Sequence, residues 1–281
     1  MNLYRDYRNG NFIEYKNGED PWFADLTIHY GIEEGITNEW KNIINTKDTE
    51  EKKKKIDALI ERLEQNSQTN GFFKSQDKVS ISAFCGVKLD DKEIYYLFFA
   101  KLEKIYKLLL KAEKKDIDGF AIFSAIKETL QTYFDKDKND TPFDLKEANK
   151  KRFNLSAITA NEDDEFIPPS ISVFKNSGCA MCVEKSSVAH NLWLMCGKKS
   201  YYFTSKSVFV DANIDDGHAF CVVEYNNKFR IFDPTLGNYG ILDCNPIELI
   251  KDNIPFKVTN KNVPIVYVQT VFTNQKENNL N

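Results

Sequence analysis

The sequence has no surplus of charge of one sign. Its 38 lysine and arginine residues stand against 42 aspartate and glutamate residues, which gives a formal net charge of -4. Such a chain has no strong field to attract nucleic acid or an anionic membrane. Long apolar runs are also missing, since the longest clear one, IYYLFFA at 94–100, is far shorter than a membrane span. We therefore expect a soluble protein with neither nucleic acid nor a membrane as a partner.

Secretory and disulfide features are scarce as well. The first residues, MNLYRDYRNGNFIEY, contain no apolar segment of the kind found in signal peptides. Six cysteines in 281 residues are too few for a disulfide scaffold, and several lie within apolar runs. These features favour reduced thiols in a cytoplasmic protein, although an effector exported without a classical signal would share them.

The N-terminal half has the periodicity of amphipathic helices. Apolar residues recur at helical spacing in 56–63, 94–109 and 120–134. Between 37 and 64, Thr37 and Asn38 are candidate helix caps, and Asp48 followed by Glu51 resembles a further cap. This stretch is either one broken helix or two. The lysine run at 52–55 indicates a solvated helix face, and KVSISAFCGV at 78–87 alternates like a strand.

Two breaks follow the helical half, at 135–151 and at 161–170. The first is charged and contains Pro142, which indicates a linker or a loop. It begins like a calcium-binding loop, but Asp140 occupies the glycine position and Lys146 the position of the bidentate acid. We therefore expect a solvated loop. The predicted organisation is a mainly helical N-terminal region of unknown role at 1–160 and a second region at 161–281.

The second region has a different residue pattern from the helical first region. A helix-like stretch at 178–196 precedes runs rich in aromatic and β-branched residues at 199–210, 218–225, 228–233 and 263–272. Asn226 and Asn227 separate two of these runs and tolerate the positive φ of a hairpin turn. The last residues, 274–281, resemble a frayed tail. The sequence thus predicts an α+β protein in which a helix packs on an antiparallel sheet.

Three residues of this region combine into a reactive arrangement. If Cys182 begins the helix, the helix dipole and the unpaired N–H groups favour a thiolate and can cradle an oxyanion. His218 enters one strand after an acidic turn, and Asp233 ends the next strand. Antiparallel pairing about the asparagine turn brings these two residues close to side by side. The carboxylate can then fix the tautomer of an imidazole that faces the thiol.

These segments resemble the transglutaminase-like superfamily of cysteine enzymes, bacterial type, which share papain-like catalysis. The family has G-x-C-V-E-K-A at a helix start, then H-A-W on a strand and D-P-T at the end of the next. Here CVEKSSVAHNLWLMCG runs from Cys182 to Gly197, with Ser186 at the small-residue position; His218 begins HAF and Asp233 begins DPT. The match covers about residues 170–240. The family glycine two positions before the nucleophile is replaced by Ala180, with Gly178 four before it.

The resemblance implies a transglutaminase-like core and a role for each site residue. Cys182 would be the nucleophile, His218 the general base and then acid, and Asp233 the residue that orients the histidine. We expect a cysteine hydrolase, a peptidase or amidase, that cleaves a protein or peptide substrate through a thioester without a cofactor. Acyl transfer to, or deamidation of, protein glutamine is one alternative. A non-catalytic binding or scaffold protein is another.

Cys179 and Cys182 also form a CxxC motif, which is typical of metal or redox sites. A structural zinc needs four ligands, however, and His190 and Cys196 do not form a second pair of recognised spacing. The remaining candidates have simpler interpretations. We expect Cys179 to be a packed or loop thiol, His190 a partly buried ring with a satisfied hydrogen bond, and Trp193 a core anchor. His29 would be a structural histidine, and the other cysteines would be small hydrophobes, namely Cys85, Cys196, Cys221 and Cys244.

Overall fold

The structure is a computed structural model. It describes residues 3–5, 12–14, 38–66, 73–74, 79–80, 87–113, 115–135, 159–160, 166–167, 170–205, 207–210, 218–235, 237–242, 256–260 and 263–268, in some strands by their backbone alone. The candidates Thr37, His29, Cys85 and Cys244, the calcium-like loop after Asp135 and the tail at 274–281 lie outside these residues.

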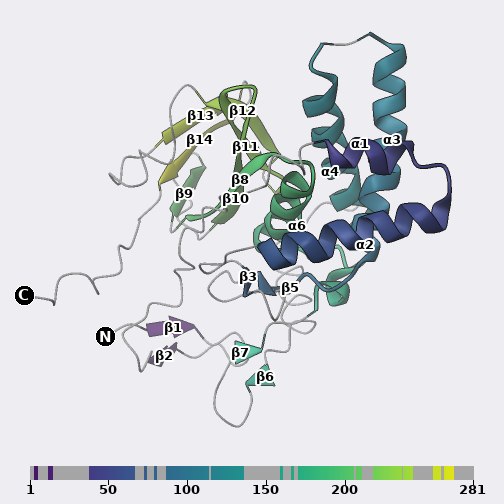
Figure 1. Cartoon of the computed structure of the whole chain (residues 1–281). Helices are drawn as coiled ribbons and strands as arrows, with labels where there is room; N and C mark the ends of the chain where they lie inside the picture. Colours follow the sequence, from purple (N-terminus) through teal and green to yellow (C-terminus); the bar gives the residue numbers. More distant parts are fainter. Residues whose placement is uncertain are drawn as a thin grey trace, which may run out of the picture.

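Four helices form most of the described N-terminal half (Figure 1). They are α1 (Glu39–Asn45), α2 (Thr49–Asn66), α3 (Glu93–Lys111) and α4 (Ile117–Phe134). The stretch at 37–64 therefore contains two helices. The predicted Asp48 cap is confirmed, because the Glu51 N–H donates to the Asp48 carboxylate at 2.7 Å. Asn38 precedes α1, but its side chain makes no capping hydrogen bond to this described helix.

The helices pack through the predicted apolar faces, with Phe98 and Leu102 of α3 and Ile126 of α4 completely buried. Leu108 and Phe120 share the predicted apolar periodicity but are 58% and 53% exposed. Both lie near the connection from α3 to α4, where helical periodicity continues beyond the part of the hairpin that is covered by other helices (Figure 1). Periodicity reports which residues share a face, whereas burial requires a neighbouring element.

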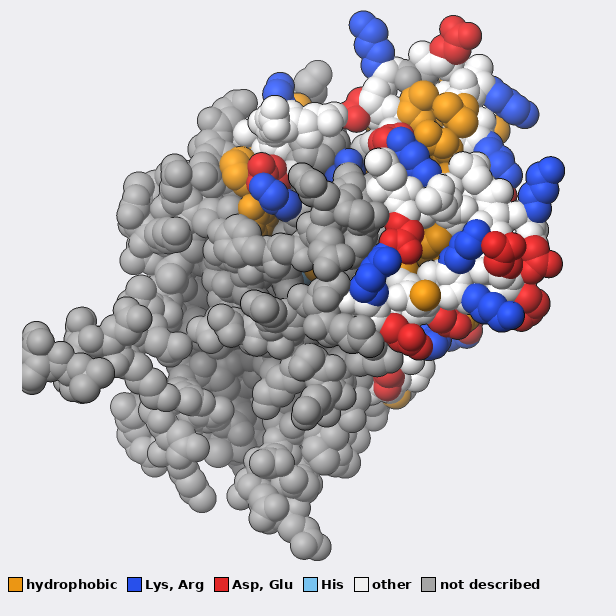
Figure 2. Space-filling view, in the orientation of Figure 1, with side chains coloured by type: hydrophobic (Ala, Val, Ile, Leu, Met, Phe, Trp, Pro, Cys, Tyr) orange, Lys and Arg blue, Asp and Glu red, His pale blue; other side chains and the backbone are white. Residues whose placement is uncertain are grey.

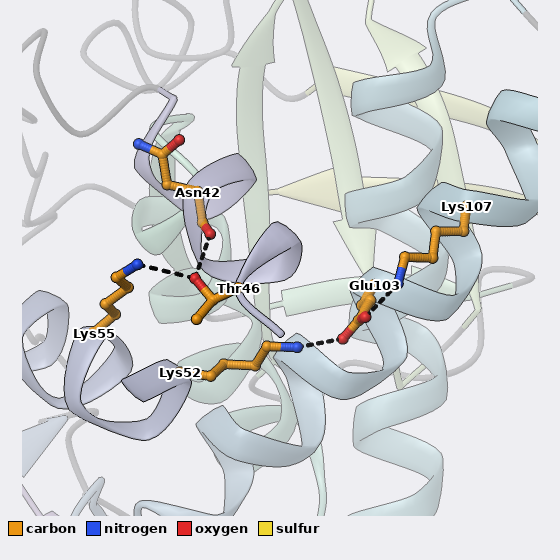
Figure 3. Close-up of polar contacts among 6 residues, drawn as sticks. All are labelled: Asn42, Thr46, Lys52, Lys55, Glu103 and Lys107. Atoms are coloured by element: carbon orange, nitrogen blue, oxygen red, sulfur yellow. Dashed lines mark hydrogen bonds and ion pairs between the residues drawn. The ribbon is translucent and has the colours of Figure 1, made fainter. Parts of the chain in front are cut away.

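The lysine run at 52–55 is only partly a solvated face. Lys53 and Lys54 are exposed, but Lys52 reaches from α2 to Glu103 of α3, and the side chain of Lys52 is only 19% exposed. Figure 3 shows Glu103 between Lys52 and Lys107, and Lys55 hydrogen-bonded to Thr46. The prediction for Lys52 was wrong because its partner lies on another helix, far away in the sequence.

Three small groups of short strands occur as well among the described residues. β1 (Leu3–Arg5) pairs with β2 (Phe12–Glu14), and β6 (Thr159–Ala160) with β7 (Phe166–Ile167). β3 (Phe73–Lys74), β4 (Val79–Ser80) and β5 (Val87–Lys88) form a small sheet. Of the strand predicted at 78–87, Val79, Ser80 and Val87 lie in β4 and β5, while 78 and 81–86 lie outside the described residues.

A helix and a four-stranded antiparallel sheet form the second half, after the 3-10 helix η2 (Ile171–Phe174). The helix is α6 (Cys182–Met195), and the strand order is β12 (Asn238–Leu242), β11 (Lys228–Asp233), β10 (His218–Tyr225), β8 (Lys199–Ser205). A further sheet contains β13 (Phe256–Asn260), β14 (Val263–Val268) and β9 (Ser207–Val210). The α+β prediction, with a helical N-terminal region and a helix packed on an antiparallel sheet, is confirmed.

The hairpin of β10 and β11 follows its predicted turn. Asn226 and Asn227 have φ values of 51° and 53°, so both adopt the left-handed conformation that a tight two-residue turn requires. Tyr225 consequently pairs with Lys228, and Cys221 with Phe232. This local turn fixes the register of all that follows on the two strands.

One hydrophobic core extends from the helices through α6 to the sheet (Figure 1). Trp40 of α1, Phe134 of α4, Trp193 of α6 and Phe232 of β11 all belong to it. The division at residue 160 stays a prediction. On the face shown in Figure 2, lysine and acidic side chains alternate over the helical part. No helix among the described residues is both long and apolar enough to span a membrane.

Candidate active site

Cys182 is the first residue of α6, so the supposition that it begins the helix holds, although the helix-like stretch was expected to start at residue 178. The residue before it, Met181, is extended, and its N–H donates to the Glu184 carboxylate at 2.9 Å. That contact caps the helix from within its first turn. Four free thiols occur among the described residues, and Cys182 is the one that is not fully buried. Cys182 is therefore a partly exposed thiol at a helix N-terminus.

The chain that leads to Cys182 is fixed to the end of α4. The N–H of Asn176 donates to the Tyr133 carbonyl at 2.8 Å, and the N–H of Gly178 to the Phe134 carbonyl at 2.9 Å. These acceptors are among the last carbonyls of α4, which have no partner within the helix itself. Gly178 has a φ of 66°, a conformation that glycine adopts without strain. The glycine four positions before the cysteine therefore provides the bend of this approach.

An ion pair joins the same two helices. Lys185, in the first turn of α6, lies 3.0 Å from Asp135, which follows α4. Their side chains are only 13% and 17% exposed. The thiol-bearing end of α6 is thus held by the helical N-terminal region through backbone and side-chain contacts.

One face of α6 lies on the sheet. The Ser186 hydroxyl donates to the Ala219 carbonyl of β10 at 2.9 Å, and Nδ1 of His190 lies 2.9 Å from the Ser200 hydroxyl of β8. Farther along, the Trp193 ring meets Phe232 of β11 edge to face, with centroids 5.6 Å apart. The predictions of Trp193 as a core anchor and of His190 as a hydrogen-bonded ring are confirmed, although His190 is fully buried and not partly buried as expected. Ser186 is fully buried too.

His218 is the first residue of β10, where its backbone pairs with Ser205 of β8. Its side chain lies outside the described residues. Asp233 is the last residue of β11 and is fully buried, and one of its carboxylate oxygens accepts the Thr235 N–H at 3.1 Å. Since Cys221 pairs with Phe232, one further step sets Asp233 opposite Phe220. Positions 218 and 233 are then diagonal neighbours on adjacent strands. Contact between their side chains stays a prediction.

The other described cysteines are protected. Burial raises the pKa of Cys221 well above its ordinary value, and the negative charge of Asp233 raises it further. Burial likewise raises the pKa of Cys196. Cys179 is buried in the loop before α6, with its sulfur 3.2 Å from the Ser177 hydroxyl. The predictions of a packed loop thiol and of small hydrophobes are confirmed for these three residues.

The described residues contain no group of three or more histidine, cysteine, aspartate or glutamate side chains suited to hold a metal. Sequence reasoning also missed contacts that support the site. Glu184 stands three residues after Met181, which is the spacing of a capping pair and could have indicated its role. The pairing of Lys185 with Asp135 carries no such local signal.

Comparisons of this chain with protein-family models, with curated proteins and with solved structures found no match.

Proposed function

We propose that this protein is a cysteine hydrolase of peptide or amide bonds, with Cys182, His218 and Asp233 as its catalytic triad. The observation that carries the proposal is the alignment of α6 with β10. Its chemistry is that of the transglutaminase-like enzymes, which these residues resemble.

Two contacts define the alignment. His190 is held by Ser200, whose strand partner on β10 is Val223. Ser186, one helical turn earlier, is held by Ala219 and also accepts a hydrogen bond from the Cys221 thiol at 3.3 Å. The helix and the strand therefore run in the same direction. Four residues of helix rise about 6 Å, which corresponds to about two residues of strand.

Extending this alignment by one turn leads to the proposed pair. The residue one turn before Ser186 is Cys182, and the strand position about two residues before the Ser186 contacts is His218. The proposal requires the His218 ring to extend past the start of β10 towards the tip of α6. Asp233, fully buried at the end of the neighbouring strand, is then in register to orient the ring.

The reaction follows from these roles. His218 takes the proton of the Cys182 thiol as the sulfur attacks the substrate carbonyl, and N–H groups at the start of α6 stabilise the oxyanion. The C–N bond breaks, His218 delivers the proton to the leaving amine, and a thioester remains on Cys182. Water, deprotonated by His218, then attacks the thioester and releases the carboxylic acid and the free thiol.

The negative charge of Asp233 is consistent with its proposed role beside the His218 ring. Burial is the main cause that raises the pKa of Cys221 and of Tyr239, and the negative charge of Asp233 raises both further. A buried anion favours the protonated imidazole that forms during the attack. Cys221 itself, fully buried and held protonated, is unsuited to be the nucleophile.

A peptide library made by digestion of a cell extract provides the test. The library is incubated with the wild-type protein or with Cys182→Ala, and mass spectrometry detects new termini, conversion of glutamine to glutamate, and cross-links. New termini formed by the wild type alone support hydrolysis. Glutamate formation or cross-links without new termini would select deamidation or acyl transfer instead. Identical products from both proteins, or no product from either, would contradict the proposal and favour a non-catalytic binding protein.

A further inference from the structure

We infer that Ser186 is a positioning residue, whose two hydrogen bonds to β10 hold the Cys182 thiol in register with His218. The inference rests on the proposed function. It concerns how the nucleophile helix is fixed in register with the strand that begins with the histidine.

Ser186 contacts β10 in two ways. Its hydroxyl donates to the Ala219 carbonyl at 2.9 Å, and its own carbonyl accepts from the Cys221 thiol at 3.3 Å. Ser186 and Cys221 are completely buried, and Ala219 is 1% exposed. Water does not compete for hydrogen bonds in such surroundings. The hydroxyl contact is the stronger of the two, because a thiol is a weak donor.

These contacts lie close to both proposed catalytic residues, Cys182 and His218. Ser186 follows Cys182 by one helical turn, and Ala219 directly follows His218 in the chain. The contact of His190 with Ser200 lies one turn farther from the thiol and involves another strand. A shift of α6 along or around its axis would displace the thiol from the start of β10 and would break the Ser186 contacts.

The choice of serine is informative. In a helix interior, alanine has the higher propensity, and a serine hydroxyl commonly bonds to the carbonyl one turn earlier in its own helix. Here the hydroxyl bonds to a neighbouring strand instead. Alanine would fill the same small space, so the hydroxyl contributes a specific alignment that small size alone would not provide.

The experiment measures the rate at which iodoacetamide alkylates Cys182 between pH 5 and 10, by peptide mass spectrometry. It compares the wild type with Ser186→Ala and His218→Ala. The matched control is Thr129→Val, because Thr129 is also fully buried and donates to a backbone carbonyl, that of Ala125, but within α4. Cys221→Ala is the second variant, since it removes the other hydrogen bond without altering α6.

In the wild type we expect iodoacetamide to alkylate Cys182 faster at pH 7 than in His218→Ala, because the imidazole takes the thiol proton. Ser186→Ala should reduce the alkylation rate at pH 7 by about tenfold and move the profile towards that of His218→Ala, because the thiol and the ring lose register. Cys221→Ala should act in the same direction, and Thr129→Val should leave the profile unchanged.

Two other results would overturn the inference in distinguishable ways. If His218→Ala changes the profile but Ser186→Ala and Cys221→Ala do not, Ser186 has no positioning role and the proposed function stands. If His218→Ala has the wild-type profile, the thiol and histidine pair does not exist, and the proposed function fails together with the inference. Should Ser186→Ala not fold, Cys221→Ala alone decides between these results.

Discussion

Lys185 and Asp135 form an ion pair of 3.0 Å that is largely shielded from solvent. The lysine belongs to the first turn of α6, and the aspartate directly follows α4. Together with the hydrogen bonds of Asn176 and Gly178 to the last carbonyls of α4, this pair joins the helical region to the helix that begins with Cys182. The N-terminal region therefore contributes to the support of the candidate site.

Replacing Lys185 by methionine should lower the free energy of unfolding by about 1–3 kcal/mol, since it leaves the Asp135 carboxylate in a poorly solvated position without its cation. Lys175→Met is the matched control, because Lys175 pairs with Glu93 on the surface, where the side chains are 35% and 57% exposed. That change should leave the free energy of unfolding nearly unchanged, because a solvent-exposed ion pair contributes little to stability. Urea denaturation measures both, and equal losses would contradict the role given to the Lys185 pair.

Glu103 should make stability depend on pH. Burial acts to raise its pKa, but hydrogen bonds and charge from Lys107 and Lys52 outweigh burial and lower it (Figure 3). The folded protein thus releases this proton more readily than the unfolded chain does. The resulting stability is present above the ordinary glutamate pKa of about 4.3 and is lost as the pH falls through the lower folded value.

Glu103→Gln should therefore lower the free energy of unfolding by about 0.5–1 kcal/mol at pH 7. The difference from the wild type should shrink as the pH is lowered to about 3, where the wild-type carboxylate becomes protonated too. Urea titrations at both pH values measure this. A difference that stays constant or grows at low pH would show that the carboxylate charge is not the cause.

The hairpin turn offers a test of the register between β10 and β11. Asn227 has a φ of 53°, so Asn227→Ala should destabilise the protein by about 1 kcal/mol, whereas Asn227→Gly should be neutral or stabilising. Thermal unfolding of the two variants makes the comparison. Equal effects of alanine and glycine would contradict the left-handed conformation of this residue.

Asp233→Asn should reduce turnover of a cleaved peptide by about 10²–10⁴, because an amide no longer selects the correct histidine tautomer. The control is Glu224→Gln on β10, a partly exposed carboxylate that accepts from the Tyr201 hydroxyl at 3.1 Å. That variant should keep nearly the wild-type rate. Wild-type turnover by Asp233→Asn would remove Asp233 from the triad.

Features that depend on nearby residues were predictable from the sequence. The periodicity of apolar residues located α3 and α4, the spacing of Asp48 and Glu51 located the start of α2, and two asparagines located the hairpin turn. The register of β10 and β11 followed from that turn, because two residues in left-handed conformation leave one way to pair the strands. The apolar pattern also located α6, but at 178–196, four residues earlier than its observed start at Cys182.

Features that depend on distant partners were not predictable. The pairing of Lys52 with Glu103, of Lys185 with Asp135 and of Ser186 with Ala219 each joins residues that are far apart in the chain. The short strands β12 and β13 were missed as well, since pairing with neighbouring strands rather than local preference decides such segments. The exposure of Leu108 and Phe120 likewise depends on where the covering helices end.

The central claim is that Cys182 is a nucleophile activated by His218. Its most direct test is to treat the native protein at neutral pH with a limiting amount of iodoacetamide and to identify the labelled cysteines by peptide mapping, in the wild type and in His218→Ala. Cys182 should be labelled first in the wild type and lose its advantage in the variant, while the buried Cys179, Cys196 and Cys221 react only after unfolding. Equal or greater labelling of Cys179, or a Cys182 rate that does not depend on His218, would contradict the account.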